Sequence, residues 1–184
     1  MYYPRFFKRL ISSLIIGGQA INFIFRGKIS KNDLVDQLME SGPGSLLIVL
    51  ITGIAAGTVF NIQIASQLKE LEQGNLIGGL LAVGMAREMA PLLTATLMAG
   101  KVATAYAAQI GTMKVTEQIE AITMLKTEPI QYLVVPRVLS MIIMSPIQCF
   151  LFLIVGLWSG QIFSYALYGV PPDVFWTSIR LGEV

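Results

Sequence analysis

Two long runs without a charged residue constrain the fold of this chain most. Residues 41–68 contain no Asp, Glu, Lys or Arg, and neither do residues 138–172. A helix needs about 20 mostly apolar residues to cross the hydrocarbon of a bilayer, and both runs exceed that length. Overall, 54% of the residues are hydrophobic and 13% are charged, whereas soluble domains carry about 25% charged residues. The sequence therefore predicts an all-α, polytopic membrane protein.

Three transmembrane helices are expected. The first covers residues 46–65, after a start signal at Gly42-Pro43-Gly44, and the second covers residues 76–100. The third begins near Val138 and is too long for one perpendicular crossing, so it must tilt, extend beyond the membrane or fold back. Small residues four apart permit close helix packing. They occur in the first span at Gly53 and Gly57, and in the third at Gly156 and Gly160.

Residues 1–40 are predicted to form an N-terminal interfacial amphipathic region, and residues 41–184 the transmembrane region. A basic start and the apolar residues 10–16 resemble a signal peptide, but no small-residue cleavage site follows. A retained interfacial helix is therefore favoured over a cleaved signal. A second short helix is expected after a cap at Ser30, with Leu34, Val35, Leu38 and Met39 on one face. Pro171-Pro172 should end the third span, and another helix should begin near Val174.

Loop charges predict the orientation. Cytoplasmic loops carry an excess of Lys and Arg. Basic residues precede the first span and lie between or beside the second and third spans, at Arg5, Lys8, Arg9, Arg26, Lys28, Lys31, Lys101, Lys114, Lys126 and Arg137. Three spans with the N-terminus inside, in the cytoplasm or its plastid equivalent, fit this distribution.

Arg87, Glu88 and Pro91 interrupt the second span and are the candidate substrate-binding residues. Charged side chains within a span face the protein interior or a water-filled cavity, and they mark functional sites. Arg87 could hold an anionic head group such as a lipid phosphate, and Pro91 could bend the helix and open a cavity. The alternative is that the charged pair lies near the membrane interface and only pins the helix.

Residues 111–127 are expected to form one short cytoplasmic helix. Val115, Ile119 and Ile122 share one side at helical spacing, while Glu117 and Glu120 supply charge elsewhere. Such a helix could lie on a partner protein or on lipid head groups. Anionic lipid would repel the glutamates, which favours a protein partner.

Several chemistries find no support in the sequence. There is no histidine, and Cys149 is the only cysteine, so neither a metal site nor a cofactor site is expected. No nucleophile elbow or phosphate-binding loop occurs. The net charge of +2 is scattered, so a nucleic-acid partner is not expected. The chain is predicted not to be an enzyme; any uphill transport needs a separate nucleotide-hydrolysing subunit.

The chain resembles the MlaE family of ABC-transporter permeases. The family pattern joins R-E-x-x-P, A-G-[RK], E-I-G-x-M, E-Q-I-x-A-[LI] and a D-P or E-P step. The matching residues are Arg87-Glu88 with Pro91, Ala99-Gly100-Lys101, Ile110-Gly111-Thr112-Met113, Glu117-Gln118-Ile119 with Ala121-Ile122, and Glu128-Pro129. The match weakens toward residues 175–176, and the first thirty residues match mainly in character.

The resemblance implies a homodimeric permease that binds cytoplasmic ATP-binding subunits and works with a lipid-binding substrate-carrier protein on the opposite face. It places Arg87 and Glu88 at a lipid cavity between protomers. It also implies a coupling segment that includes Ile110, Gly111, Met113, Glu117, Gln118, Ile119 and Ile122. The implied substrates are glycerophospholipids or related lipids.

Three departures from the family pattern stand out. Gln109 replaces the usual Glu before Ile-Gly, and Lys101 replaces the commoner Arg, which loses bidentate hydrogen bonding. The chain also stops where family members continue through about two more spans, as a fragment, a split gene product or a reduced form would.

The leading functional prediction is therefore the permease subunit of a lipid-moving ABC transporter. The residues are consistent with a bacterial or cyanobacterial inner membrane and with a plastid inner envelope. The alternative is a non-transporting membrane scaffold or assembly factor, which the early stop makes more credible.

Overall fold

The computed structural model describes residues 3–25 and 31–181, and every regular element within those residues is a helix. The chain falls into two compact units that interleave along the sequence. One comprises Met1–Pro43 and Lys101–Met144, and the other comprises Gly44–Gly100 and Ser145–Val184. Each unit draws on both the N-terminal and the C-terminal half of the chain.

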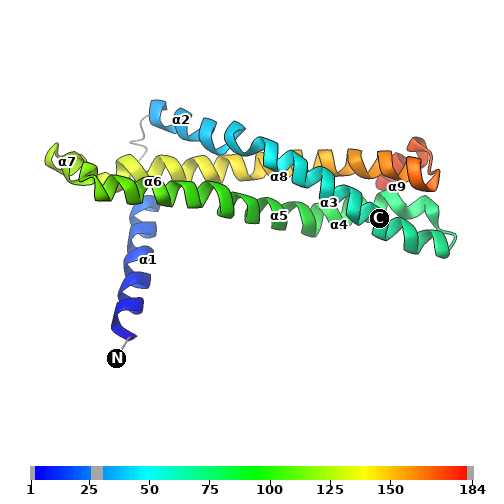
Figure 1. Ribbon diagram of the computed structural model, residues 1–184, viewed down its shortest axis with the longest axis horizontal. Coiled ribbons are helices and arrows are strands. Elements are labelled where there is room, and N and C mark those ends of the chain that lie inside the picture. Colours follow the sequence, from blue (N-terminus) through cyan, green and yellow to red (C-terminus); the bar gives the residue numbers. More distant parts are fainter. Residues whose placement is uncertain (1–2, 26–30, 182–184) are drawn as a thin grey trace. The chain divides into compact units, whose positions relative to one another are not determined.

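Within residues 3–25 and 31–181, three helical segments are long and apolar enough to cross a membrane, which confirms the predicted number (Figure 1). The first is α3 (Pro43–Glu70), which begins at the predicted proline. The second is one continuous helical segment from Gly74 to Val115, and the third runs from Ile130 to Tyr168. The third segment does not fold back; it extends as a single helix through Pro146.

The second segment joins several elements end to end. A short 3₁₀ turn (Gly74–Leu76) leads into α4 (Ile77–Gly84), and a π-helical turn (Met85–Met89) leads into α5 (Ala90–Leu97). A second π-helical turn (Met98–Ala103) then leads into α6 (Thr104–Val115). The helix continues beyond the predicted span of residues 76–100, because the chain keeps helical geometry past Lys101 to Val115.

The prediction of one helix over residues 111–127 is wrong, because these residues belong to two separate helices. Residues 111–115 complete α6, and α7 is a separate helix over Gln118–Met124. Glu117 between them has φ 58°, in the left-handed region that an α-helix cannot include. Ile110, Gly111 and Met113 therefore lie on the end of the second span, and only Gln118, Ile119 and Ile122 lie on α7.

The flanking helices mostly agree with expectation. α1 covers Tyr3–Phe25 and continues through Gln19 and Asn22, and α2 covers Lys31–Ser41. The expected cap at Ser30 lies outside the described residues. Val35 and Met39 of α2 are exposed, whereas Leu34 and Leu38 are half-buried. A π-helical turn (Ile130–Val134) precedes α8 (Val135–Tyr168), and α9 (Pro172–Leu181) begins at the predicted proline break.

Glycines bring α3 and α8 into close contact within the second unit. A Cβ atom added at Gly57 would collide with the backbone of Gly156, and one added at Gly53 would lie 3.2 Å from the Phe152 carbonyl oxygen. Ser159 donates a 3.1 Å hydrogen bond from α8 to the Ile54 carbonyl oxygen of α3. The two small-residue pairs predicted from sequence therefore face each other, as close packing of membrane helices requires.

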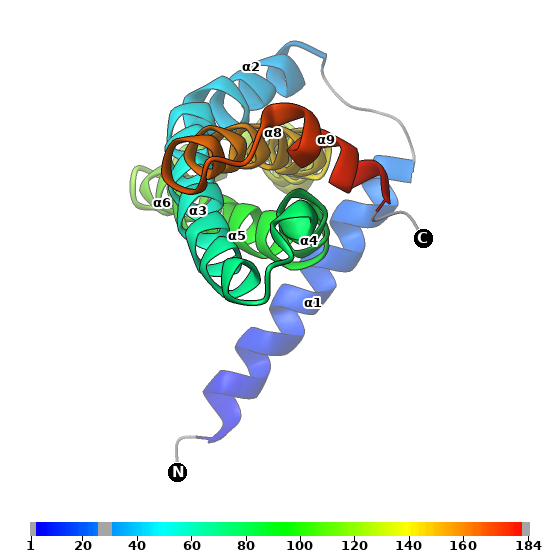
Figure 2. The same ribbon diagram turned by 90° about the vertical axis from the view of Figure 1, so that its right-hand side faces the viewer.

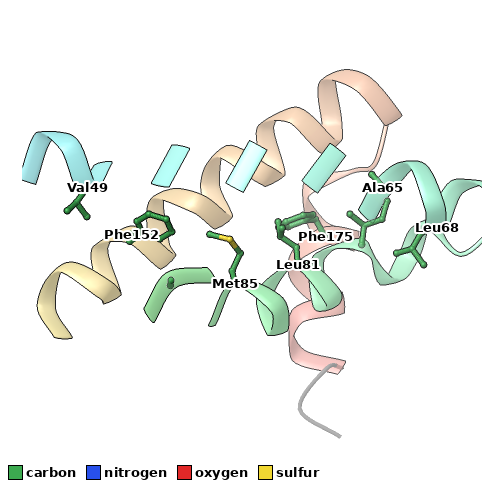
Figure 3. Close-up of a cluster of buried hydrophobic side chains, with 9 residues drawn as sticks. Val49, Ala65, Leu68, Leu81, Met85, Phe152 and Phe175 are labelled. Carbon is green, nitrogen blue, oxygen red and sulfur yellow. The ribbon is translucent and has the colours of Figure 1, made fainter. Parts of the chain in front are cut away.

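Apolar side chains from α3, α4, α8 and α9 form the core of the second unit (Figure 3). Figure 3 shows Phe152 beside Met85, and Phe175 beside Leu81. Helix α9 packs on α4 at the end of the unit that faces the viewer in Figure 2. The Gly79 amide of α4 donates a 3.1 Å hydrogen bond to the Ser178 hydroxyl of α9. Ser178 thus satisfies one of the amides that the first turn of a helix leaves without an intrahelical partner.

Candidate functional site

Arg87 and Glu88 lie on the π-helical turn Met85–Met89. Within this turn the Ala90 amide bonds to the Met85 carbonyl, five residues earlier instead of four. Such turns are rare and often mark functional sites. Arg87 follows the start of the helical segment at Gly74 by thirteen residues, or about 20 Å at 1.5 Å per residue. The charged pair therefore lies well inside the helical segment, away from its first turns.

Both charged side chains are exposed on the single chain. Met85 and Ala90, at either end of the turn, are buried and occupy the side that faces the rest of the chain. Neither Arg87 nor Glu88 makes a hydrogen bond or an ion pair with any residue that the structure describes. Within the described residues, the two charges therefore project from the helix without a charged partner.

Pro91 directly follows this π-helical turn. Proline has no amide hydrogen, so it cannot bond to the carbonyl of Arg87, its partner four residues earlier in a regular α-helix. The loss of that bond accompanies the wider turn over Met85–Met89 and the start of α5 at Ala90. The three candidate substrate residues are thus brought together on one irregular stretch of backbone.

The other π-helical turns coincide with further parts of the family pattern. Ala99-Gly100-Lys101 lies within the turn Met98–Ala103, and Glu128-Pro129 immediately precedes the turn Ile130–Val134. The spacing of hydrophobic residues and the capping residues do not distinguish a π-helical turn from an α-helix, so the sequence does not predict these turns. The motif residues were identifiable from sequence, but the backbone geometry at them was not.

Helix α7 is bounded by two non-glycine residues in the left-handed conformation. Glu117 before it has φ 58° and Lys126 after it has φ 57°. This conformation costs about 1–2 kcal/mol for a residue with a side chain, and such strain concentrates at functional sites. Figure 1 shows α7 as a short helix that follows the end of α6, and the two helices are in contact.

Large apolar side chains near α7 face solvent. Val115 and Met124 are each 84% exposed and Leu125 is 79% exposed, and no residue of α7 itself is buried. Lys114 and Glu120 form an exposed ion pair of 2.7 Å across the break between α6 and α7. An exposed apolar patch with a polar rim is typical of a protein-binding surface.

The structure also shows a buried polar cluster that the sequence analysis did not identify. Arg137 was read only as a loop charge that sets orientation, yet its side chain is 8% exposed. It donates to the Leu133 carbonyl oxygen at 2.8 Å and to Gln109 Oε1 at 3.1 Å. Its guanidinium carbon lies 5.6 Å from the centre of the Tyr106 ring. Among the described residues no carboxylate lies within ion-pair distance of it.

Tyr106 and Gln109 connect this cluster to α2. The Tyr106 hydroxyl lies 3.1 Å from the Gln37 carbonyl oxygen, to which it donates, and 3.3 Å from the Ser140 hydroxyl. Gln109 donates from Nε2 to Glu40 Oε1 at 2.7 Å. α2, α6 and α8 are therefore joined by side-chain hydrogen bonds around one buried guanidinium. The signal that could have indicated this was the departure at Gln109, whose meaning depends on partners far away in sequence.

Comparison with known proteins agrees with these features. The sequence model of the Permease MlaE family matches residues 34–182. A probable ABC transporter permease protein of Synechocystis is 42% identical over 95% of this chain. The chloroplastic TRIGALACTOSYLDIACYLGLYCEROL 1 protein of Arabidopsis thaliana is 35% identical over 92% of it. The intermembrane phospholipid transport system permease protein MlaE of Haemophilus influenzae is 34% identical over 80%.

The chain spans only part of the length of these relatives: 66% of the Synechocystis protein, 49% of the Arabidopsis protein and 56% of the Haemophilus protein. The family match nevertheless covers most of the chain and includes the three π-helical turns, α7 and the buried Arg137 cluster. Together with the three apolar helical segments, this match identifies the chain as an integral membrane protein of the MlaE permease family.

Proposed function

We propose that this chain is the membrane-spanning subunit of an ATP-driven transporter of phospholipids or related lipids. The observation that carries the proposal is the exposed, unneutralised pair Arg87 and Glu88 on an irregular turn of an apolar span. Charge at that depth requires a polar partner or water. A lipid head group in a cavity between two copies of the chain would supply both, with Arg87 holding the phosphate.

The names of the relatives support a lipid substrate. The Haemophilus protein is named for intermembrane phospholipid transport, and the Arabidopsis protein is chloroplastic. We infer that this chain acts in a bacterial or cyanobacterial inner membrane or a plastid inner envelope, with a lipid-binding carrier protein on the outer face.

Hydrolysis of ATP takes place in a separate subunit under this proposal. The surface available for that subunit is α7 with the exposed side chains of Val115, Met124 and Leu125. Glu117 adds negative charge beside the same segment, whereas Glu120 is paired with Lys114. Apolar contacts would supply affinity, and Glu117 would direct a basic partner surface to the correct place.

The substrate role is tested by replacing Arg87 and Glu88 with Ala and measuring ATP-dependent lipid transfer by the complex purified from its native membrane. We expect transfer to fall at least tenfold, because loss of a charged hydrogen-bonding partner costs about 1.5–3 kcal/mol. The matched control replaces Lys69 and Glu70, another adjacent pair of opposite charge, which lies exposed at the end of α3. Equal transfer by the two double variants would contradict the proposal.

The partner role is tested by co-purification of an ATP-binding subunit with wild type and with Glu117→Lys. The matched control is Glu72→Lys, because Glu72 is also exposed and has the same φ of 58°. Both substitutions keep the backbone strain and reverse the charge, but only Glu117 adjoins α7. Loss of the subunit in Glu117→Lys alone supports the proposal. Absence of the subunit from every folded sample would favour the scaffold alternative.

A further inference from the structure

We propose that Gln109 is a positioning residue that ties α6, and through it α7, to the helix leading into the first span. Its side-chain amide donates to Glu40 on α2 at 2.7 Å and accepts from Arg137 on α8 at 3.1 Å. The consequence for transport rests on the proposed function, whereas the tether itself does not.

Only a side chain that both donates and accepts can make these two contacts. A carboxylate at position 109 would still accept from Arg137, but it would repel Glu40. An apolar side chain would remove both contacts and leave Arg137 only its hydrogen bond to the Leu133 carbonyl oxygen. The orientation of the amide is determined by its neighbours, because a flipped amide would direct its NH₂ group at the Arg137 donor and its oxygen at the Glu40 carboxylate.

Tyr106 provides a further connection between the same helices. The Tyr106 hydroxyl donates to the Gln37 carbonyl oxygen at 3.1 Å. Tyr106 and Gln109 are three residues apart on α6, and their partners Gln37 and Glu40 are three residues apart on α2. Residues three apart lie on one face of a helix, so both contacts join the same two faces. α6 therefore carries a two-contact tether to α2. The Tyr106 contact ends on a backbone carbonyl, so only the Gln109 contact depends on the side chain of its partner in α2.

The position of the tether suits transmission of movement. Gln109 lies six residues before the end of α6 at Val115, or about 9 Å along the helix axis, and α7 begins three residues later at Gln118. Glu40 lies in the last turn of α2, and α3 begins at Pro43. A displacement of α7 by a bound subunit would therefore pull on α2 through Gln109 as well as along the α6 backbone.

The test is a double-mutant cycle in the full chain, purified with whatever subunits it retains. Gln109→Glu replaces the donor with a second carboxylate facing Glu40. Glu40→Gln keeps an acceptor for Gln109. The double variant Gln109→Glu/Glu40→Gln reverses the polarity of the contact, because the new amide at 40 can donate to the new carboxylate at 109 while Arg137 still donates to the carboxylate.

The first measurement is amide hydrogen exchange of α2, with α3 as the internal control. We expect Gln109→Glu to speed exchange in Lys31–Ser41 by at least about tenfold, the scale of one hydrogen bond to a charged group, without changing Pro43–Glu70. Glu40→Gln should exchange like wild type, and the double variant should return to near wild type. Unchanged exchange in Gln109→Glu, or no recovery in the double variant, would overturn the tether.

The second measurement is ATP-dependent lipid transfer, with retention of the ATP-binding subunit measured in parallel. We expect Gln109→Glu to lower transfer severalfold while retaining the subunit, and the double variant to recover. Normal transfer in a variant whose α2 exchanges faster would overturn the positioning role and leave the proposed function intact. If wild type itself transfers no lipid, the proposed function fails, and hydrogen exchange alone decides the tether.

Discussion

The contact between α3 and α8 can be tested with a graded series of Gly→Ala substitutions. At Gly57 the new methyl group would meet the carbonyl oxygen, Cα and carbonyl carbon of Gly156, all of them backbone atoms that cannot rotate away. At Gly53 it would lie 3.2 Å from the Phe152 carbonyl oxygen, so a shift of a few tenths of an ångström suffices. At Gly111, in α6, it would meet nothing within 4 Å.

Two opposing terms determine the size of each effect. Overpacking costs about 1–3 kcal/mol, and Ala stabilises a helix over Gly by about 0.8–1.0 kcal/mol. The backbone collision at Gly57 belongs at the upper end, which leaves a net loss of about 2 kcal/mol. At Gly53 the two terms nearly cancel. At Gly111 only the propensity term remains, so Gly111→Ala should stabilise the chain by about 0.5–1 kcal/mol.

The assay is thermal unfolding of each variant in the same detergent micelle. A chain of this size shifts its Tm by about 2–4 °C for each kcal/mol, so Gly57→Ala should lower the Tm by about 4–8 °C. Gly53→Ala should leave it within about 2 °C of wild type. Equal shifts at Gly57 and Gly111, or a larger loss at Gly53 than at Gly57, would refute the close approach of α3 and α8.

Two further predictions concern single hydroxyl groups. Ser178→Ala removes the acceptor of the Gly79 amide and leaves that buried donor unpaired, so the free energy of unfolding should fall by about 1–3 kcal/mol. The control is Ser66→Ala, which removes an exposed hydroxyl on α3. Equal Tm shifts in the two variants would contradict the role of Ser178. Tyr106→Phe keeps the ring beside Arg137 but loses the contacts to Gln37 and Ser140. A loss of about 0.5–1.5 kcal/mol is expected, and an unchanged free energy of unfolding in Tyr106→Phe beside a large loss in Tyr106→Ala would show that the ring matters and the hydroxyl does not.

Sequence reasoning performed well where the bilayer dictates the pattern. The number of spans, the start of α3 at Pro43 and the break before α9 follow from charge-free length and proline chemistry, which are local properties. The contact between Gly57 and Gly156 could also be anticipated, because small residues four apart have few other uses in a membrane helix.

The features that the sequence did not reveal share a physical cause. The charge pattern indicates where the hydrocarbon ends, near Lys101, but it does not show that helical backbone bonding continues beyond that residue to Val115. Arg137 was assigned to a loop because its neutral partners, Gln109 and the Leu133 carbonyl oxygen, cannot be recognised as such from sequence. Burial of a charge depends on tertiary contacts, and a charge count does not contain them.

The π-helical turn at Met85–Met89 changes how the second helix should be compared with those of its relatives. The buried positions before the turn recur every four residues and those after it do the same, but the step across the turn is five: Ile77, Leu81, Met85, then Ala90, Thr94 and Met98. The turn thus accommodates one additional amino acid and leaves the packed face on either side unchanged. In a regular α-helix one extra residue would rotate all later side chains by about 100° around the helix axis. A relative with one residue fewer at this place would keep the same buried contacts in an ordinary α-helix and would lose the outward step that carries Arg87 and Glu88. A single-residue gap in an alignment here would therefore mark a difference in the site, not a difference in the fold.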